Sequence, residues 1–544
     1  MLIRTLSRKS RVNQAARVSL ALGTLFSSGC GLINKVAPGP GPHDTRTSYH
    51  DSVGLQISYP EVRDCANEVT AAARTSVSPL VAEDPSKIPT FDLTLADAVQ
   101  MAVRQSPVVR ELGGTLVTQP GFSQTIYDPS LAHANPQIGV EAALAAFDAQ
   151  FAGQLFWNKQ DRPNNVRGIG SQFTPQVFQG TNATYQTELS KRTAQGARFA
   201  LRHVTLYERN NSPIRQFPSD FTGWLEAEWR QPLMRGAGTE FNRIAGPSGI
   251  IGQYNGVLIA RVNEEVALAD FEAAVVRLVN DVEQAYWELS LSYRTLEATL
   301  RGREGALINY RKEAFKENVG STAIDQLSQS ESLYFQFQSQ VDSALSGQQG
   351  LYASEQRLRY LLGMPPADGR LIKPITEPNS IRVVFDWESA LSQALQRRVE
   401  IRRQRFNLKR REMELIAARL NRRPQLDFLG NYRWRGLGDN LIGGSGGELD
   451  NLFAEVSGGQ YQEWQAGMEL TFPVGLRAAS NAVAHARLLL NREQAVLNET
   501  ELRISHSLSD AVRRIGLTHN LLETNYNGLL ANRRRYEEIG RAHV

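Results

Sequence analysis

Residues 282–300 read VEQAYWELSLSYRTLEATL, and this stretch decides the fold. Its apolar residues are separated alternately by four and three positions, at Val282, Tyr286, Leu289, Tyr293, Leu296 and Leu300. That heptad spacing is typical of a helix that packs along one narrow apolar seam. Proline is absent from Ile250 to Asn318. We therefore expect one continuous helix of about 69 residues, roughly 100 Å long.

A second helical segment is expected to return alongside the first. Val319-Gly320 interrupts the first pattern, and helical spacing resumes over Ala323–Leu362. The seam of this second segment includes Leu327, Leu333, Phe337, Val341 and Leu345. Gly363 and the pair Pro365-Pro366 then end it, because neither residue type continues a helix readily. The sequence therefore predicts an antiparallel helical hairpin with a glycine turn.

Segments with alternating apolar residues precede each long helix. They are Gln150–Trp157, Thr181–Ser190, Arg198–Tyr207, Phe221–Gln231, Gln425–Arg435 and Tyr461–Phe472. A tilted strand of about ten residues crosses an outer membrane. Five of the seven tryptophans lie in or at the ends of these segments, as aromatic girdles would require: Trp157, Trp224, Trp229, Trp434 and Trp464. A soluble β-sandwich with one partly buried face is the alternative.

The order of helix, alternating segment, proline and long helix occurs twice in the chain. Asp97–Arg104 aligns with Ser389–Gln396 at an offset of 292 residues. Later, Gln231-Pro232-Leu233 aligns with Phe472-Pro473-Val474, and both precede a long helical pattern. Such internal similarity predicts two structurally related halves.

The excess of positive charge lies in the first residues. The chain has 60 Lys and Arg against 56 Asp and Glu, a formal charge of +4. Residues 1–29 hold five basic residues and no acidic ones, so the remainder has 55 basic against 56 acidic residues. This balance excludes a broad basic surface for nucleic acid. Two cysteines are too few for a disulfide scaffold or a cysteine zinc module.

The N-terminus has the pattern of an export signal. A basic region is followed by the apolar run Val18–Phe26, the small residues Ser27-Ser28-Gly29 and then Cys30. The apolar run is too short to span a bilayer. Cys30 resembles the lipidated first residue of a bacterial lipoprotein, although Ser27 stands where such signals usually carry leucine. The alternative is cleavage nearby, with Cys30 and Cys65 free to form a disulfide.

Residues 91–537 resemble the outer-membrane efflux protein family, the TolC-like channels. The resemblance rests on the opening helix Leu93–Arg110, the junction Gln231-Pro232-Leu233, the turn Val319–Leu327 and the helix end Arg357–Gly363. It implies a mainly α-helical fold with membrane β structure. In that fold a duplicated helix–β–long-helix repeat forms a trimeric β-barrel and a periplasmic α-helical barrel.

The same resemblance implies an outer-membrane channel of a tripartite efflux or type I secretion system in a Gram-negative-type bacterium. Such a channel passively exports small molecules or proteins from the periplasm. The implied partners are two further copies in a homotrimer, a periplasmic adaptor (membrane fusion protein), an inner-membrane pump and outer-membrane lipid, without nucleic acid. The adaptor would dock on the periplasmic tip, which consists of Val319, Gly320, Ser321, Thr322, Ala323, Ile324 and Asp325. A structural coiled-coil envelope lipoprotein or a periplasmic adaptor is the alternative function.

The chain departs from the family pattern in two places. The first half carries two additional strand-like segments within residues 181–207, and whether this hairpin joins the barrel wall is open. In the first half 52 residues follow Tyr310 to reach Leu362, whereas eight residues follow Tyr536. We therefore expect the second long helix to be truncated, its end to be a sequencing artefact, and the family's gate residues to be missing.

These observations predict nine segments. The first two are a signal peptide (1–29) and a lipidated tether (30–90). Repeat 1 consists of opening helices (91–147), a membrane β segment (148–232) and a long helical hairpin (233–365). Repeat 2 consists of opening helices (366–423), a membrane β segment (424–473) and a truncated long helix (474–537), and the artefact (538–544) follows it.

No catalytic residue, metal site or cofactor is predicted. Gly443–Gly447 matches the G-x-S-x-G pattern of hydrolases but lacks the strand before it and the helix after it, so we expect a loop. The histidines show no metal-ligand spacing. The basic helix Arg397–Arg411 fits an exposed periplasmic face better than a site for nucleic acid or lipid headgroups. Asp325 also fits a plain charge at a helix N-terminus.

Overall fold

The structure is a computed structural model that describes residues 76–79, 85–105, 107–110, 123–168, 170–246, 250–321, 324–444 and 449–542. These residues belong to one compact unit, Ala71–Val544. The predicted signal peptide, the lipidation site Cys30, Cys65, and the tip residues Thr322 and Ala323 lie outside the described residues. No helix of the described part combines the length and hydrophobicity that a membrane span needs.

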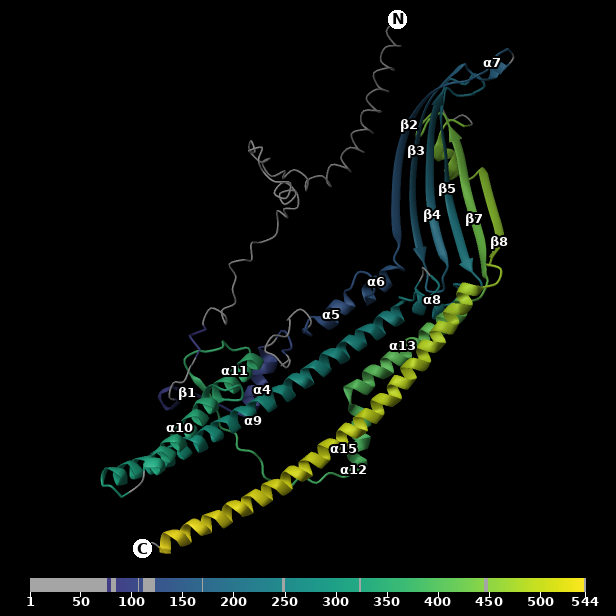
Figure 1. The fold of residues 1–544 in the computed structure, drawn as a ribbon. Coiled ribbons are helices and arrows are strands. Elements are labelled where there is room, and N and C mark those ends of the chain that lie inside the picture. Colours follow the sequence, from purple (N-terminus) through teal and green to yellow (C-terminus); the bar gives the residue numbers. More distant parts are fainter. Residues whose placement is uncertain are drawn as a thin grey trace, which may run out of the picture. The chain divides into compact units, whose positions relative to one another are not determined.

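One antiparallel sheet contains all six predicted alternating segments (Figure 1). Its strands, in spatial order, are β2 (Gln150–Pro163), β3 (Val177–Arg192), β4 (Arg198–Asn210), β5 (Ser219–Pro232), β7 (Gln425–Gly438) and β8 (Tyr461–Thr471). The additional hairpin is therefore part of the sheet, where β3 and β4 lie between β2 and β5. Strands from both sequence halves meet where β5 pairs with β7.

The long helix and its returning partner are present, but the long helix begins at Val257 and not at Ile250 as predicted. α9 (Val257–Asn318) is followed by α10 (Ile324–Ser346) and α11 (Leu351–Leu362), and both returning helices pack on α9. The prediction of one unbroken returning helix is wrong at Gly347–Gly350. Two glycines within four residues weaken the helix there, since each costs about 1 kcal/mol in a helix interior. The next helix, α11, starts after the N-cap Gly350, whose carbonyl accepts a hydrogen bond from the Ser354 amide at 3.0 Å.

The second half supplies α12 (Trp387–Arg397), α13 (Val399–Asn421) and α15 (Arg477–Ala542). α13 contacts both α9 and α15, so it ties the long helices of the two halves together. Ala417 joins a buried cluster with α8 and α9, whereas its neighbour Ala418 joins Ala486 of α15. Consecutive residues thus pack against different neighbours, and small side chains allow close approach at both contacts.

Short elements surround the long helices. They are η3 (Pro85–Lys87), β1 (Thr90–Leu93), α4 (Leu95–Arg104), α5 (Asp128–His133), α6 (Val140–Ala145), α7 (Gly170–Phe173), α8 (Thr239–Ala245), β6 (Leu371–Pro374) and α14 (Leu452–Gly458). β1 and β6 form a parallel two-stranded ladder. The largest buried cluster joins this ladder, α4, α10 and α11 to the middle of α9.

The two opening helices begin alike. The Thr94 side chain caps α4 by accepting a hydrogen bond from the Asp97 amide, and Asp386 caps α12 through the Ser389 amide in the same way. The caps are 292 positions apart, the offset of the sequence alignment. Their surroundings differ, because α4 buries Ala98 and Ala102 whereas no described residue of α12 is buried.

Candidate functional site: a two-faced sheet joined to a helical hairpin

One face of the six-stranded sheet is apolar. Side chains alternate along each strand, and the pairing register aligns one row across all six strands: Phe151, Leu189, Leu201, Ala227, Tyr432 and Trp464. Large side chains on this apolar face are exposed, including Phe151 (74%) and Trp464 (75%). Soluble monomers rarely expose a continuous apolar surface of this kind. The face is therefore suited to contact with lipid.

Aromatic side chains gather toward both ends of the strands on the apolar face. One group consists of Phe199, Trp229 and Phe428, and the other of Trp157, Tyr207 and Phe221. Neighbouring ring centroids within each group are 5.0 to 6.3 Å apart. The expectation of a girdle position is wrong for Trp224. This residue shares the parity of Glu226 and lies on the opposite face, where the Arg435 guanidinium sits 5.4 Å from its ring centroid.

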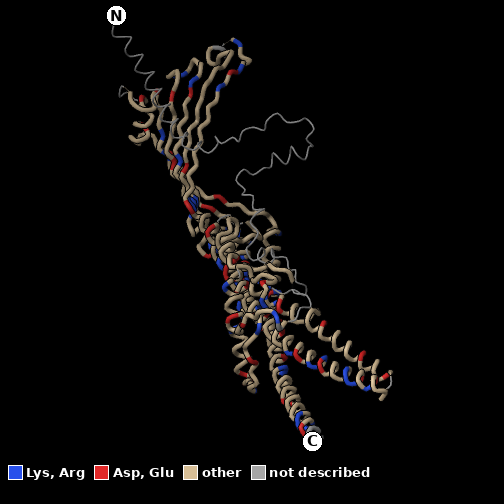
Figure 2. The backbone as a smooth tube through the Cα atoms, turned by 90° about the vertical axis from the view of Figure 1, so that its left-hand side faces the viewer, with Lys and Arg blue, Asp and Glu red and all other residues tan. Residues whose placement is uncertain are grey.

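A row of alternating charges crosses the opposite, polar face. It consists of Glu188, Arg202, Glu226, Arg433 and Glu463, on β3, β4, β5, β7 and β8. Arg202 lies 3.0 Å from Glu188 and 2.6 Å from Glu226. Arg433 pairs with Glu226 and lies 3.9 Å from Glu463. Acidic and basic residues are interspersed along the strands as a whole (Figure 2). The charged row thus pairs opposite signs rather than concentrating one of them.

A short helix lies against the apolar face, beside β5 and β7. The region between β7 and β8 contains this helix, α14, beyond the predicted loop at Gly443–Gly447. The backbone or side chain of Leu452 approaches Gly223, Gly436 and Gly438 so closely that a Cβ at each glycine would lie 2.5 to 3.0 Å from it. These three glycines provide the room for α14 to pack on the sheet. The Gly443 and Gly444 part of the G-x-S-x-G match has positive φ, as in a loop.

Both edges of the sheet have a free side within the described part of the chain. β2 pairs only with β3, and β8 pairs only with β7. Both strands are exposed along their whole length. A long exposed edge strand offers a row of unpaired backbone groups to another chain. In lipid, such groups must be paired.

The tip of the helical hairpin exposes two apolar residues. α9 ends at a Val319 cap, Gly320 takes a positive φ of 73°, and the Ser321 amide donates to the Lys316 carbonyl at 2.9 Å. The side chains of Val319 (67%) and Ile324 (72%) are exposed. Asp325 lies in the first turn of α10, where a carboxylate is favoured by the helix dipole.

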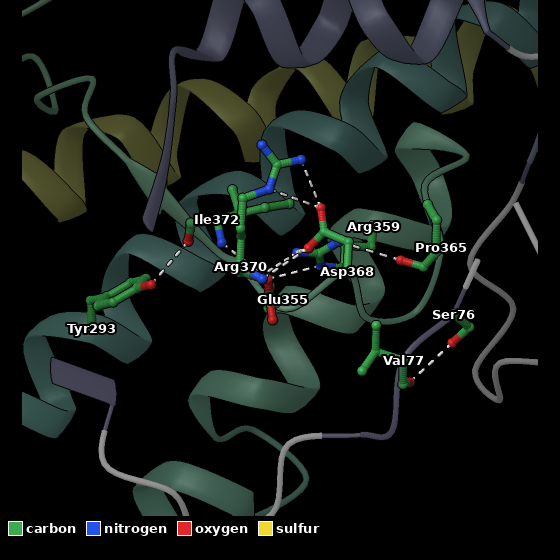
Figure 3. Close-up of polar contacts among 9 residues, drawn as sticks. All are labelled: Ser76, Val77, Tyr293, Glu355, Arg359, Pro365, Asp368, Arg370 and Ile372. Carbon is green, nitrogen blue, oxygen red and sulfur yellow. Dashed lines mark hydrogen bonds and ion pairs between the residues drawn. The ribbon is translucent and has the colours of Figure 1, made fainter. Parts of the chain in front are cut away.

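A buried arginine holds the base of the hairpin together, and the sequence interpretation missed it (Figure 3). The Arg359 side chain is 1% exposed and donates to the Glu355 carboxylate at 2.8 Å and to the Asp368 carboxylate at 2.7 Å. It also donates to the carbonyl of Arg370 at 2.5 Å. Glu355 in turn accepts a hydrogen bond from the Ile372 amide at 3.0 Å, so this Arg359 cluster anchors β6 to α11. The only sequence signal is an ordinary i, i+4 Glu–Arg pair.

The pKa values of the two carboxyl groups in the Arg359 cluster are shifted in opposite directions. Burial raises the pKa of Glu355, although the neighbouring Arg359 acts in the other direction. Desolvation also acts to raise the pKa of Asp368, but hydrogen bonds from Arg359 and Arg370 outweigh it and lower that pKa. Both guanidinium groups therefore favour the ionised form of Asp368, whereas burial disfavours the ionised form of Glu355.

Two tyrosines of the α9 seam hold the β1–β6 ladder. The Tyr286 hydroxyl donates to the Leu93 carbonyl at 2.9 Å and accepts from the Thr376 amide at 3.0 Å. One heptad later, the Tyr293 hydroxyl donates to the Ile372 carbonyl at 3.0 Å. Burial raises the pKa of the Tyr293 phenol. The seam thus combines apolar packing with fixed polar contacts.

Part of the basic helix is neutralised within the chain. On α13, Arg402 pairs with Glu272, and Arg403 lies 2.7 Å from Asp270 of α9. Arg411 lies 2.8 Å from Glu414 of the same helix. Several of these arginines therefore connect α13 to its surroundings. Across the described residues, no group of three or more His, Cys, Asp or Glu is arranged to hold a metal ion.

No protein-family model matches the chain, and no curated protein does. Several solved structures are similar. A structure titled as the CmeC outer membrane channel of Campylobacter jejuni is 14% identical, with a TM-score of 0.48, over 82% of this chain and 74% of that one. A membrane protein from Pseudomonas aeruginosa is 16% identical, with a TM-score of 0.49, over 87% and 89%. The outer membrane protein VceC from Vibrio cholerae is 12% identical, with a TM-score of 0.47, over 77% and 78%.

Proposed function

We propose that this chain is the outer-membrane channel component of a tripartite efflux or type I secretion system. Small molecules or proteins would leave the periplasm through it without being modified, so the chain is not an enzyme. The observation that carries the proposal is the two-faced sheet, with an exposed apolar face, aromatic groups toward both ends and a charge-paired polar face. Barrel walls between lipid and a water-filled lumen have this construction.

The open edges and the long helices support a homotrimer. Backbone groups in lipid must be hydrogen-bonded, so β2 and β8 require partners if the sheet lies in a membrane. Three copies would close one barrel, and their long helices would form a duct in the periplasm. Because the helix–β–helix order is duplicated, each copy would contribute strands to the barrel and a long helix to the duct from each of its two halves. The matched caps at Thr94 and Asp386 support this interpretation.

The tip of the hairpin is the proposed docking surface for a periplasmic adaptor, which would connect the duct to an inner-membrane pump. The exposed apolar residues Val319 and Ile324 support this assignment, because exposed apolar side chains at a turn are suited to protein contact. Cys30 is the proposed lipidation site, with palmitate among the acyl chains that would anchor the chain in the outer membrane of a Gram-negative-type bacterium.

Conductance of the purified full chain in planar bilayers tests the proposal. We expect single-channel steps, together with an oligomer in outer-membrane fractions whose gel mobility changes on heating. Conductance should be unchanged in a Val319→Ser/Ile324→Ser variant, whereas drug or protein export in cells should be lost. A folded trimer without conductance would favour a structural envelope lipoprotein. A chain that does not partition into the membrane would favour a periplasmic adaptor.

A further inference from the structure

The hairpin of β3 and β4 continues both faces of the sheet without interruption. On the apolar face, Leu189 and Leu201 lie in the same row as Phe151 of β2 and Trp464 of β8. On the polar face, Glu188 and Arg202 supply two members of the charged row. A hairpin that folded away from the wall would have no reason to match its neighbours on both faces.

The charged row depends on this hairpin. Glu226 of β5 is 3% exposed and is held by Arg202 on one side and Arg433 on the other. Without β4, one of the two guanidinium groups beside this carboxylate would be absent. A buried carboxylate is costly unless charge and hydrogen bonds compensate it. The hairpin therefore contributes a structural partner to a strand outside itself.

We propose that β3 and β4 are wall strands of the membrane barrel, so that each copy contributes six strands. This inference rests on the proposed channel function and deepens it. Neighbouring strands are antiparallel throughout, and six is even, so β2 and β8 run in opposite directions. The free edge of β8 can therefore pair with β2 of a second copy of this chain and continue the antiparallel order.

The consequence is a wide barrel. Three copies bring eighteen strands, whereas the same chain without its β3–β4 hairpin would bring twelve. Barrel diameter grows roughly in proportion to strand number, so the lumen would be about 1.5-fold wider and its cross-section about twofold larger. The membrane part would then admit larger solutes than a four-strand contribution from each copy.

Four single-cysteine variants test whether the hairpin lies in the wall, in a full-length Cys30→Ser/Cys65→Ser background. Leu189→Cys and Ser190→Cys lie next to each other on β3, and Trp464→Cys and Gln465→Cys do so on β8. Leu189 and Trp464 share one apolar row, and Ser190 and Gln465 share one polar row. Each variant is labelled with an environment-sensitive fluorophore and reconstituted with bromolipid vesicles.

We expect bromolipid to quench the labels at positions 189 and 464 severalfold more than those at 190 and 465. Quenching at 464 without quenching at 189 would overturn the wall hairpin and leave the channel proposal standing. Quenching at neither position would overturn the membrane assignment itself. Quenching at 189 and 190 alike would also contradict the proposal, since a two-faced wall strand exposes only one of them to lipid.

Strand number is measured on the unmodified full chain. Electron microscopy of the detergent-solubilised oligomer, at a resolution that separates strands about 4.8 Å apart, should show six strands from each copy in one closed ring. A ring with four strands from each copy would refute the inference. Deleting residues 177–210 should preserve the antiparallel order, because it removes two neighbouring strands. That variant should exclude polymers that the intact channel admits.

Discussion

α9 and α15 follow the strand segments of the two aligned halves, yet their surroundings differ. α9 packs against α4, α5, α6, α8, α10, α11 and α13, whereas α15 packs mainly against α12 and α13. Val282 and Tyr286 of α9 are fully buried, but Leu508 and Val512 of α15, which have the same spacing, are not. From residue 505 to residue 538, no described side chain of α15 is buried.

The same sequence pattern therefore determines helix formation in both places but not the burial of the helix. Apolar residues at heptad spacing form a helix with a seam in both places. Burial of that seam depends on whether another element covers it. α10 and α11 cover α9 through apolar packing, and the Arg359 cluster and the two tyrosines fix β6 beside them.

Replacing Arg359 by alanine should have the largest effect on the α9 region. The substitution leaves the Glu355 carboxylate buried without its guanidinium partner, and breaking a buried ion pair in this way costs about 3 to 5 kcal/mol. Urea unfolding in detergent, followed by far-UV circular dichroism, should show a lower midpoint. Arg301→Ala, an exposed i, i+4 pair on α9, is the control and should barely change it. Equal effects would mean that the cluster is not a special anchor.

Matched leucine substitutions compare the two helices directly. Leu289 of α9 is fully buried, and Leu521 of α15 is 51% exposed. Leu289→Ala should cost about 2 to 5 kcal/mol, through lost burial and a residual cavity. Leu521→Ala should cost much less in the monomeric chain, whose mass is checked by light scattering. If both substitutions lowered the free energy of unfolding by similar amounts, the α15 seam would be covered in solution. The proposed difference between α9 and α15 would then be wrong.

Tyr286→Phe isolates the polar part of the seam. The ring and its packing remain, but the Leu93 carbonyl and the Thr376 amide lose their shared hydroxyl. Leaving buried polar groups unsatisfied costs about 1 to 3 kcal/mol. Amide hydrogen exchange should show faster opening of β1 and β6 than in the parent chain. Tyr526→Phe on exposed α15 should leave exchange in that ladder unchanged.

The pH dependence of the Arg359 cluster should give the smallest effect. The folded-state pKa of Asp368 is lowered, so its ionised form contributes stability above the unfolded-state pKa, which is about 4. That contribution is lost as the pH falls through the lowered folded-state value. The unfolding midpoint of the parent chain should therefore exceed that of Asp368→Asn at pH 7, and the difference should shrink below about pH 4. A constant difference at all pH values would contradict this assignment.

The spacing of apolar residues predicted helices and strands well where the pattern extended over many residues or occurred several times. The α9 seam, the glycine turn at Gly320 and the alternating strands were all readable from spacing alone. The break at Gly347–Gly350 and the helix α14 were not, because short helices are set by local caps and by packing on neighbours. Trp224 was assigned by its residue type, but its parity in β5 puts it on the polar face.

The candidate site was readable only in part. Alternation predicted that the strands would have two faces, but it could not say which strands are neighbours. The charged row joins Glu226 to Arg433 across 207 positions, and such distant pairings depend on register. The Arg359 cluster likewise joins α11 to Asp368 and β6 through a turn that has no periodic pattern.

The sequence by itself determined where this chain forms helices and strands and which side of each is apolar. The reason is that backbone geometry repeats with fixed periods, which side chains reveal along the chain. Tertiary structure alone decided that β3 and β4 lie inside the sheet, that Arg202 and Arg433 share Glu226, and that α9 is enclosed while most of α15 is exposed. These outcomes depend on contacts between distant residues, and no local period encodes them.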